Sequence, residues 1–313
     1  MPRSTIRDSF LRATEDLLRH GVSMSELRSR SIRVRVDSRK NPHSPEFRRT
    51  AIAVALAIGA TGAIAFALNR ILDSGVFGRC LVPGSYLSWE STRPVSSCSF
   101  CLGVENALQL PGNSTRKEFE PYAYSSRPIV VKGAASHWPA SRVFGLRFFG
   151  DLYDGIEGAY ESVEEDCQFL HFKSDFDTLR RVFSMDELPE SWYVGWKNCH
   201  PGVLEAMARY YEVPRFLPED AEVPRANYVF LGHQQGAPMH LDYIPRLMWQ
   251  AQLIGGKTWR VAPTPECDHS CKSFEFSAAP GDIVLLDTRV WYHATFVDEG
   301  RSDLTLALAS EYG

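Results

Sequence analysis

Residues 240–261, HLDYIPRLMWQAQLIGGKTWRV, decide the fold that this sequence predicts. His240-Leu241-Asp242 alternates as a β-strand does, so His240 and Asp242 face one side while Leu241 packs behind them. His293 follows 51 residues beyond Asp242. Two imidazoles and one carboxylate can occupy one face of an octahedral metal and leave three positions open, which suits non-haem Fe(II). These three residues are therefore the candidate catalytic and metal-binding residues.

The sequence around this triad is typical of short β-strands. Residues 248–254 and 257–262 are β-prone runs separated by two glycines, which predicts a tight hairpin with the glycines at positive φ. Lys257 opens the second strand, 17 residues after His240. A turn, a buried strand and the distal histidine follow at 280–282, 283–286 and 293. This order predicts a double-stranded β-helix, which is a small jelly roll.

With these motifs, residues 225–313 resemble the jumonji-C, cupin-like family of Fe(II)- and 2-oxoglutarate-dependent oxygenases. Residues 126–134 and Trp138-Pro139-Ala140 are similar to that family's entry strand and following loop, so the resemblance covers roughly residues 117–313. It implies a mainly β fold with flanking helices, and Fe(II), 2-oxoglutarate and O2 as cofactors. It also implies hydroxylation of a protein side chain, or demethylation if the hydroxylated carbon is an N-methyl group.

The resemblance also assigns roles to individual residues. His240, Asp242 and His293 match the iron ligands of the family. Lys257 matches the lysine that pairs with the distal carboxylate of 2-oxoglutarate. Thr305, 12 residues beyond His293, lies where some relatives place a hydroxyl near the cosubstrate.

Other positions match the family less closely. Gln250 aligns with a cosubstrate asparagine, and Tyr228 and Tyr193 are further candidates for cosubstrate contact. Ala237 replaces a Thr or Ser, and residues 287–290 lack the usual proline and are one residue longer. These departures leave two alternatives open: a cupin-fold protein that binds metal or ligand without turnover, and an interaction protein with a vestigial pocket.

The net charge of −4 is unevenly distributed along the 313 residues. Residues 1–70 hold 13 Lys and Arg against 6 Asp and Glu, whereas residues 71–313 hold 21 against 32. An acidic globular part argues against nucleic-acid binding and favours a basic peptide or protein substrate, although ordinary solubility explains it equally well. The oligomeric state is not indicated by the sequence.

Residues 50–68 contain no charged side chain. A helix of about 20 apolar residues spans a bilayer, so this stretch predicts a single transmembrane helix. The arginines before it favour a cytosolic N-terminus and a type II signal anchor, with the C-terminal domain in the lumen of the endoplasmic reticulum or Golgi. A buried Ala-rich helix and a mitochondrial presequence with an inner-membrane anchor are the alternatives.

All seven cysteines lie beyond this segment, as expected of an oxidising compartment. Cys98-x2-Cys101 and Cys267-x3-Cys271 could form a zinc site, but disulfides among these four are favoured. Asn113-Ser114-Thr115 is a glycosylation sequon.

The chain thus divides into four parts. The expected parts are a cytosolic basic tail (1–49), the transmembrane helix (50–68), a Cys-containing stalk (69–116) and the catalytic domain (117–313). Within the tail, residues 5–20 fit either an amphipathic helix or a partly ordered segment, and we favour the latter. Within 117–224, the sequence predicts helices at 144–153 and 203–211 and strands at 168–172 and 192–196.

Overall fold

The computed structural model describes the following residues: 3–26, 28, 52–53, 55–56, 59–64, 66, 68, 86–172, 174–185, 187, 189–297 and 304–313. They belong to two compact units, Met1–Arg93 and Pro94–Gly313. The first unit contains α1 (Arg3–Arg19) and α4 (Tyr86–Thr92). A 17-residue helix therefore forms at the N-terminus, where the sequence favoured a partly ordered segment.

The prediction of a transmembrane helix over 50–68 is wrong. In the described ranges, no helix is both long enough and apolar enough to cross a membrane. The prediction gave too much weight to the lack of charge, because 8 of these 19 residues are alanine and 2 are glycine. Such side chains bury little apolar surface, and a spanning helix needs about 20 predominantly apolar residues. The single-pass type II topology depended on this helix and is wrong with it, and the lumenal placement and the membrane partner lose the helix on which they rested.

Two β-sheets make up the described part of the second unit, which is mainly β with flanking helices and consistent with a jelly roll. The large sheet has eight strands in the order β1-β2-β9-β6-β11-β5-β4-β3, and the small sheet has three in the order β10-β7-β8. Among the strands of the described residues, only β1 and β2 pair in parallel. The strands are β1 (Leu108–Pro111), β2 (Ile129–Lys132), β3 (Gln168–Leu170), β4 (Trp192–Asn198), β5 (Asn227–His233), β6 (Leu247–Ile254), β7 (Lys257–Pro263), β8 (Phe274–Ala278), β9 (Ile283–Leu286), β10 (Trp291–Phe296) and β11 (Leu304–Tyr312).

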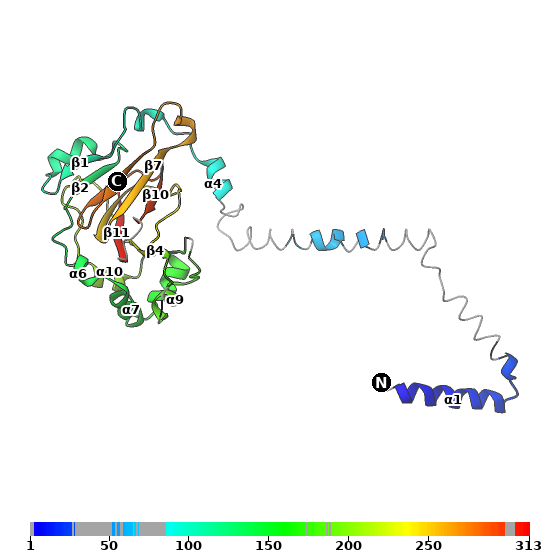
Figure 1. The fold of residues 1–313 in the computed structure, drawn as a ribbon. Coiled ribbons are helices and arrows are strands. Elements are labelled where there is room, and N and C mark those ends of the chain that lie inside the picture. The colour runs from blue at the N-terminus through cyan, green and yellow to red at the C-terminus, as the bar shows by residue number, and fades with distance from the viewer. Residues whose placement is uncertain are drawn as a thin grey trace. The chain divides into compact units, whose positions relative to one another are not determined.

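Short helices cover one face of the large sheet, and Figure 1 shows α6, α7, α9 and α10 grouped on one side of the unit. The α-helices are α5 (Arg116–Phe119), α6 (Ala140–Val143), α7 (Leu146–Asp154), α8 (Ala159–Glu161), α9 (Leu179–Ser184) and α10 (Pro201–Met207). Single turns of other helix types lie at Cys98–Phe100, Glu120–Tyr122, Ser162–Asp166 and Pro265–Cys267. The helices and strands predicted between 144 and 211 are confirmed to within a few residues.

Aromatic packing explains why the helices lie on this face. Trp192, Val194 and Trp196 alternate along β4 and are all buried in the main core. The Trp196 ring packs edge-on against Phe149 of α7, with centroids 5.2 Å apart, and against Phe183 of α9 at 5.8 Å. Alternation then directs the intervening side chains of the strand to the other face of the sheet.

The other face of the large sheet packs against the small sheet. Val130 and Val284 of the large sheet share a buried cluster with Trp259 and Val261 of β7. The interior between the two sheets is therefore where the inward-facing side chains of β7 and β10 lie. This is the region in which the predicted site residues are found.

The predicted hairpin across Gly255 and Gly256 is wrong, although both strands exist. β6 pairs with β11 and β9, whereas β7 pairs with β10 and β8. Gly255 does have a positive φ of 64°. The turn carries the chain from the large sheet to the small sheet, because local turn chemistry fixes the change of direction but not the pairing partner. As a result Lys257 begins the small sheet.

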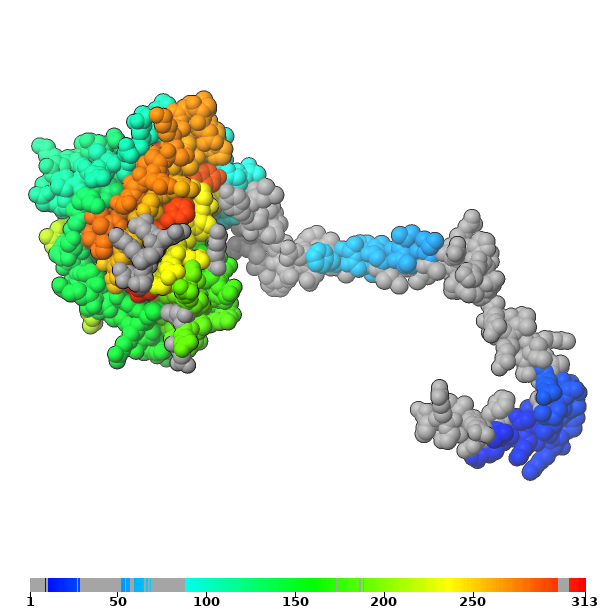
Figure 2. Space-filling view, viewed as in Figure 1, coloured from blue at the N-terminus to red at the C-terminus, as the bar shows by residue number. Residues whose placement is uncertain are grey.

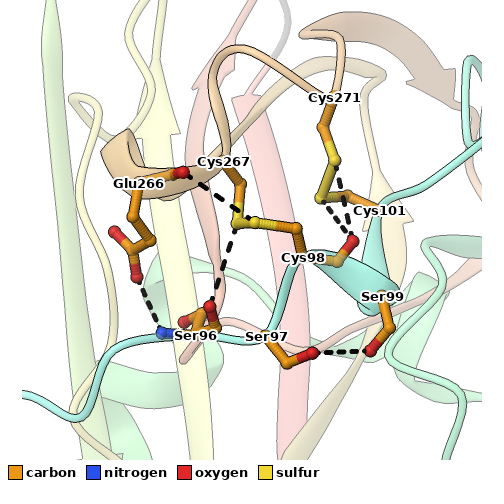
Figure 3. The surroundings of a disulfide bond; sticks show 8 residues. All are labelled: Ser96, Ser97, Cys98, Ser99, Cys101, Glu266, Cys267 and Cys271. Atoms are coloured by element: carbon orange, nitrogen blue, oxygen red, sulfur yellow. Dashed lines mark hydrogen bonds between the residues drawn. A yellow bond between two sulfur atoms is a disulfide. The ribbon is translucent and has the colours of Figure 1, made fainter.

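Two disulfides join the start of the second unit to the loop after β7, as favoured by the sequence over a zinc site. The pairs are Cys98–Cys267 and Cys101–Cys271, and they lie next to each other (Figure 3). Residues 268–270 of this loop are exposed, in the orange surface of the unit in Figure 2. A third disulfide joins Cys167 and Cys199. Cys80 lies outside the described residues.

Candidate metal centre

A backbone bridge brings the first and last predicted ligands together. His240 N donates to His293 O at 3.0 Å, and His293 N donates to His240 O at 2.9 Å. His293 lies on β10, and His240 lies in the segment between β5 and β6. The two imidazole centroids are 4.2 Å apart. Residues far apart in sequence are thus fixed side by side by main-chain hydrogen bonds.

Asp242 completes the group. Its backbone N donates to Thr288 O at 2.9 Å. Its Oδ1 lies 3.4 Å from His240 Nε2, and its Oδ2 lies 3.7 Å from His293 Nε2. One potential ligand atom from each of the three residues lies within 4.8 Å of the others. The His240 and Asp242 side chains are 27% and 25% exposed and that of His293 is 7%, so the group is accessible from one side.

Hydrogen bonds at the far nitrogens of both imidazoles indicate which nitrogens are free. His240 Nδ1 lies 2.6 Å from Pro238 O, and His293 Nδ1 lies 3.2 Å from Trp291 O. A carbonyl oxygen only accepts, so each Nδ1 carries the hydrogen, and in the neutral imidazole each Nε2 keeps its lone pair. Both Nε2 atoms face Asp242. This is the arrangement in which a metal-binding histidine is oriented by a backbone carbonyl, and the donor set fits Fe(II).

The protonation of the three residues also suits a metal. Burial, with the nearby His240, lowers the pKa of His293 to about 4. Burial acts the same way on His240, but its hydrogen bond to Asp242 and the charge of that carboxylate outweigh it and raise the pKa. Burial opposes ionisation of Asp242, yet the two histidines and Thr288 hold its pKa below the usual range. The proton on His240 is therefore the one that competes with a metal ion.

Lys257 is a buried ammonium with little compensation. Lys257 is the first residue of β7 and is only 2% exposed. Its Nζ donates to the Tyr193 hydroxyl at 2.9 Å and lies 4.6 Å from that ring's centroid. Within the described residues no carboxylate pairs with it, and burial lowers its pKa to about 7. A buried cation of this kind favours an anionic ligand.

The lysine and the histidine lie on the same inward face of the small sheet, with one row of side chains between them. Trp259, two residues after Lys257, stacks on His293 with centroids 6.0 Å apart. Thr295, two residues after His293, lies opposite Trp259 on the paired strand. The candidate anion site is therefore separated from the metal site by about one inward-facing side chain on each strand.

The remaining sequence candidates divide into two places. Thr305 lies opposite Gly232, to whose carbonyl its Oγ1 donates at 3.2 Å, and Gly232 lies opposite Tyr193. Thr305 is therefore grouped with Lys257. Tyr228 donates its hydroxyl to Glu311 Oε1 at 2.9 Å. Gln250 and Tyr228 both lie opposite Ala309, on the two strands that flank β11. Gln250 therefore lies at the same level of the sheet as Tyr228, away from Lys257.

The sequence did not indicate two residues that contact this site. Phe172, in the loop after β3, has a positive φ of 44° and places its ring 6.3 Å from His240 and 5.0 Å from Tyr193 between centroids. A loop residue gives no periodic signal. Thr295 is 4% exposed, and its Oγ1 accepts from Ala237 N at 2.9 Å. Its position two residues after His293 on one strand could have identified it.

No protein-family model and no curated protein matches this chain. Among solved structures, the chain is similar to YcfD, a ribosomal oxygenase from Escherichia coli, with a TM-score of 0.43 and 16% identity over 66% of this chain and 53% of that one. A second structure of E. coli YcfD matches with a TM-score of 0.40 and 16% identity, over 66% of this chain and 55% of that one. The chain spans about half the length of these proteins.

Proposed function

We propose that this chain is an Fe(II)- and 2-oxoglutarate-dependent oxygenase. The observation that supports it best is the pairing of two unsatisfied sites in one interior. One is a His-Asp-His group in which both Nε2 atoms face Asp242, and the other is a buried lysine that pairs with no carboxylate of the described residues. When bound by this group, Fe(II) supplies O2 activation coupled to conversion of 2-oxoglutarate to succinate and CO2.

The chain's own residues would act as follows. His240, Asp242 and His293 hold the metal, with Nδ1 of each imidazole locked to a carbonyl. Lys257 binds the distal carboxylate of 2-oxoglutarate, and the Tyr193 hydroxyl orients its ammonium. Thr305 borders the same end of the interior.

The proposed substrate is a protein or peptide side chain, which gains one oxygen atom at a C–H bond while the other oxygen atom enters succinate. The acidic balance of residues 71–313 is compatible with a basic peptide. Attack on an N-methyl group would release formaldehyde, so that product separates demethylation from stable hydroxylation.

One second candidate is favoured by particular contacts: a protein of the same fold that binds metal or ligand without turnover. The Thr305 hydroxyl already donates to Gly232 O, and Gln250 lies away from the lysine. Contact with 2-oxoglutarate would then depend mainly on Lys257 and Tyr193. Turnover, and not binding, distinguishes the two functions.

The test is succinate formation by the purified full chain with Fe(II), 2-oxoglutarate and O2, without added substrate. We expect slow turnover that is abolished by His240→Ala and retained by His269→Ala, which removes an exposed histidine outside the site. Fe(II) and 2-oxoglutarate binding without succinate would support the second candidate. Fe(II) binding and turnover that are unchanged in His240→Ala would contradict the proposed site.

A further inference from the structure

The segment between β9 and β10 contains an ion pair between a buried carboxylate, Asp287, and an exposed guanidinium, Arg289, at the place where the sequence departs from the family pattern. Asp287 is 2% exposed. Its carboxylate accepts from Ser126 Oγ at 2.6 Å and from Arg289 Nε and Nη2 at 2.8 and 3.0 Å. The Arg289 backbone N also lies 3.3 Å from Asp287 Oδ1. Both carboxylate oxygens are thus satisfied, with the guanidinium bound in a bidentate manner.

This pair holds the segment that carries Asp242. Arg289 Nη1 donates to Pro245 O at 3.0 Å, three residues beyond Asp242. Asp242 N donates to Thr288 O at 2.9 Å. Two consecutive residues of one segment therefore fix both ends of residues 242–245.

The same pair holds the strand that carries His293. Trp291 N donates to Asp287 O at 3.0 Å, and Trp291 Nε1 donates to Ser126 O at 2.8 Å. Trp291 O is in turn the carbonyl that faces His293 Nδ1. Asp287 is thereby connected to two of the three candidate ligands through hydrogen bonds, and it touches neither of them through its carboxylate.

We propose that the Asp287–Arg289 pair is the positioning element of the metal centre, fixing Asp242 relative to His293. The inference rests on the proposed function, because it presumes that these residues bind a metal. A guanidinium can satisfy a carboxylate with two N–H groups and still direct a third to Pro245 O, whereas a lysine ammonium lacks that planar fork. Residues that orient metal ligands in this way typically change metal affinity about 10- to 100-fold when removed.

The experiment is a Co(II) titration of the metal-free full chain, without O2 or 2-oxoglutarate, followed by the visible absorption of the bound ion. We expect Arg289→Ala to weaken Co(II) binding by roughly 10-fold or more and to alter the absorption band, with Arg289→Lys intermediate. The matched control is Arg260→Ala, which removes an exposed arginine whose Nε donates to Glu275 on the neighbouring strand at 2.6 Å. It should leave affinity within about twofold of the parent chain.

Thermal unfolding of the metal-free variants separates positioning from general stability. Arg289→Ala with a lower Tm but unchanged Co(II) affinity and spectrum overturns the inference. If that variant does not fold, Arg289→Lys decides: parental affinity and spectrum overturn the inference, and weaker binding supports it. If the unsubstituted chain does not bind Co(II), both the metal site and the inference are contradicted. If it binds Co(II) and both Arg289 variants bind with the same affinity, only the inference is contradicted.

Discussion

The two adjacent disulfides should stabilise the second unit as a coupled pair. Three variants test this. One replaces both Cys98 and Cys267 by alanine, the second replaces both Cys101 and Cys271, and the third replaces all four cysteines. Alanine is preferred to serine because Cys101 and Cys267 are fully buried, and a serine hydroxyl there would be desolvated without a partner. Removing both cysteines of a pair also avoids a free thiol that could exchange with the remaining bridge.

The magnitude follows from the loops that each bridge closes. The bridges span 169 and 170 residues, so whichever forms first restricts the unfolded chain by about 5 kcal/mol on the chain-entropy estimate. With one bridge in place, the other closes only a small ring through 98–101 and 267–271, worth about 2–3 kcal/mol. Loss of either bridge should therefore cost about 2–3 kcal/mol, and loss of both about 7–8 kcal/mol.

Urea unfolding of the full chain, monitored by tryptophan fluorescence, measures these free energies. The expected non-additivity is about 2–3 kcal/mol, with the fourfold variant worse than the sum of the two double variants. The Cys167–Cys199 bridge spans 32 residues elsewhere in the chain, so its removal should cost about 3–4 kcal/mol and add independently. Equal losses of about 5 kcal/mol for each bridge, summing for both, would refute the reasoning from loop entropy.

Three further predictions concern the site. Lys257→Met should abolish 2-oxoglutarate binding in calorimetry yet stabilise the metal-free chain. The parent lysine's folded pKa of about 7 lies below its unfolded value, so parent stability should rise from about pH 7 to 10 and the variant should lack this rise. Co(II) affinity should fall by about tenfold per pH unit below the raised pKa of His240, as one proton competes with the metal, and a pH-independent affinity would contradict this. Gly236→Ala should lower the free energy of unfolding in urea by at least about 1–3 kcal/mol, because its Cβ would clash with the Thr295 carbonyl. Gly145→Ala is the control, because its Cβ meets open space and should not have this cost.

The candidate ligands could be predicted because their signal is local or depends on simple spacing. Alternation of His240 and Asp242 along an extended segment places both side chains on one face, and the structure brings them together with His293. Lys257 was identified by the family resemblance, in which its spacing from His240 along the sequence matches, and the structure buries it. The sequence did not show that Lys257 donates a hydrogen bond to the Tyr193 hydroxyl, because Tyr193 lies 64 residues away on a strand of the other sheet.

Features that depend on tertiary contacts were beyond the sequence. Whether β6 and β7 pair with each other depends on where β11 and β10 lie, and no local residue encodes that. The tautomers of the two histidines likewise depend on the carbonyls of Pro238 and Trp291, which the fold aims at each Nδ1. Absence of charge over 50–68 was the opposite case, a local signal that was read too strongly, because alanine and glycine satisfy it without supplying enough apolar surface.

The departures from the family pattern show why a substitution cannot be judged without its partners. Ala237 lacks the hydroxyl that many members of the family resembled by the sequence have at this position, but its backbone N–H donates to Thr295 Oγ1 on β10. Residues 287–290 lack the proline, but Asp287 is bound by Arg289 and by Ser126, which lies 161 residues away in sequence. A buried carboxylate with those partners stabilises the segment, whereas without them it would be strongly destabilising. The same residue therefore weakens or supports the metal-centre assignment depending on contacts that only the folded chain reveals.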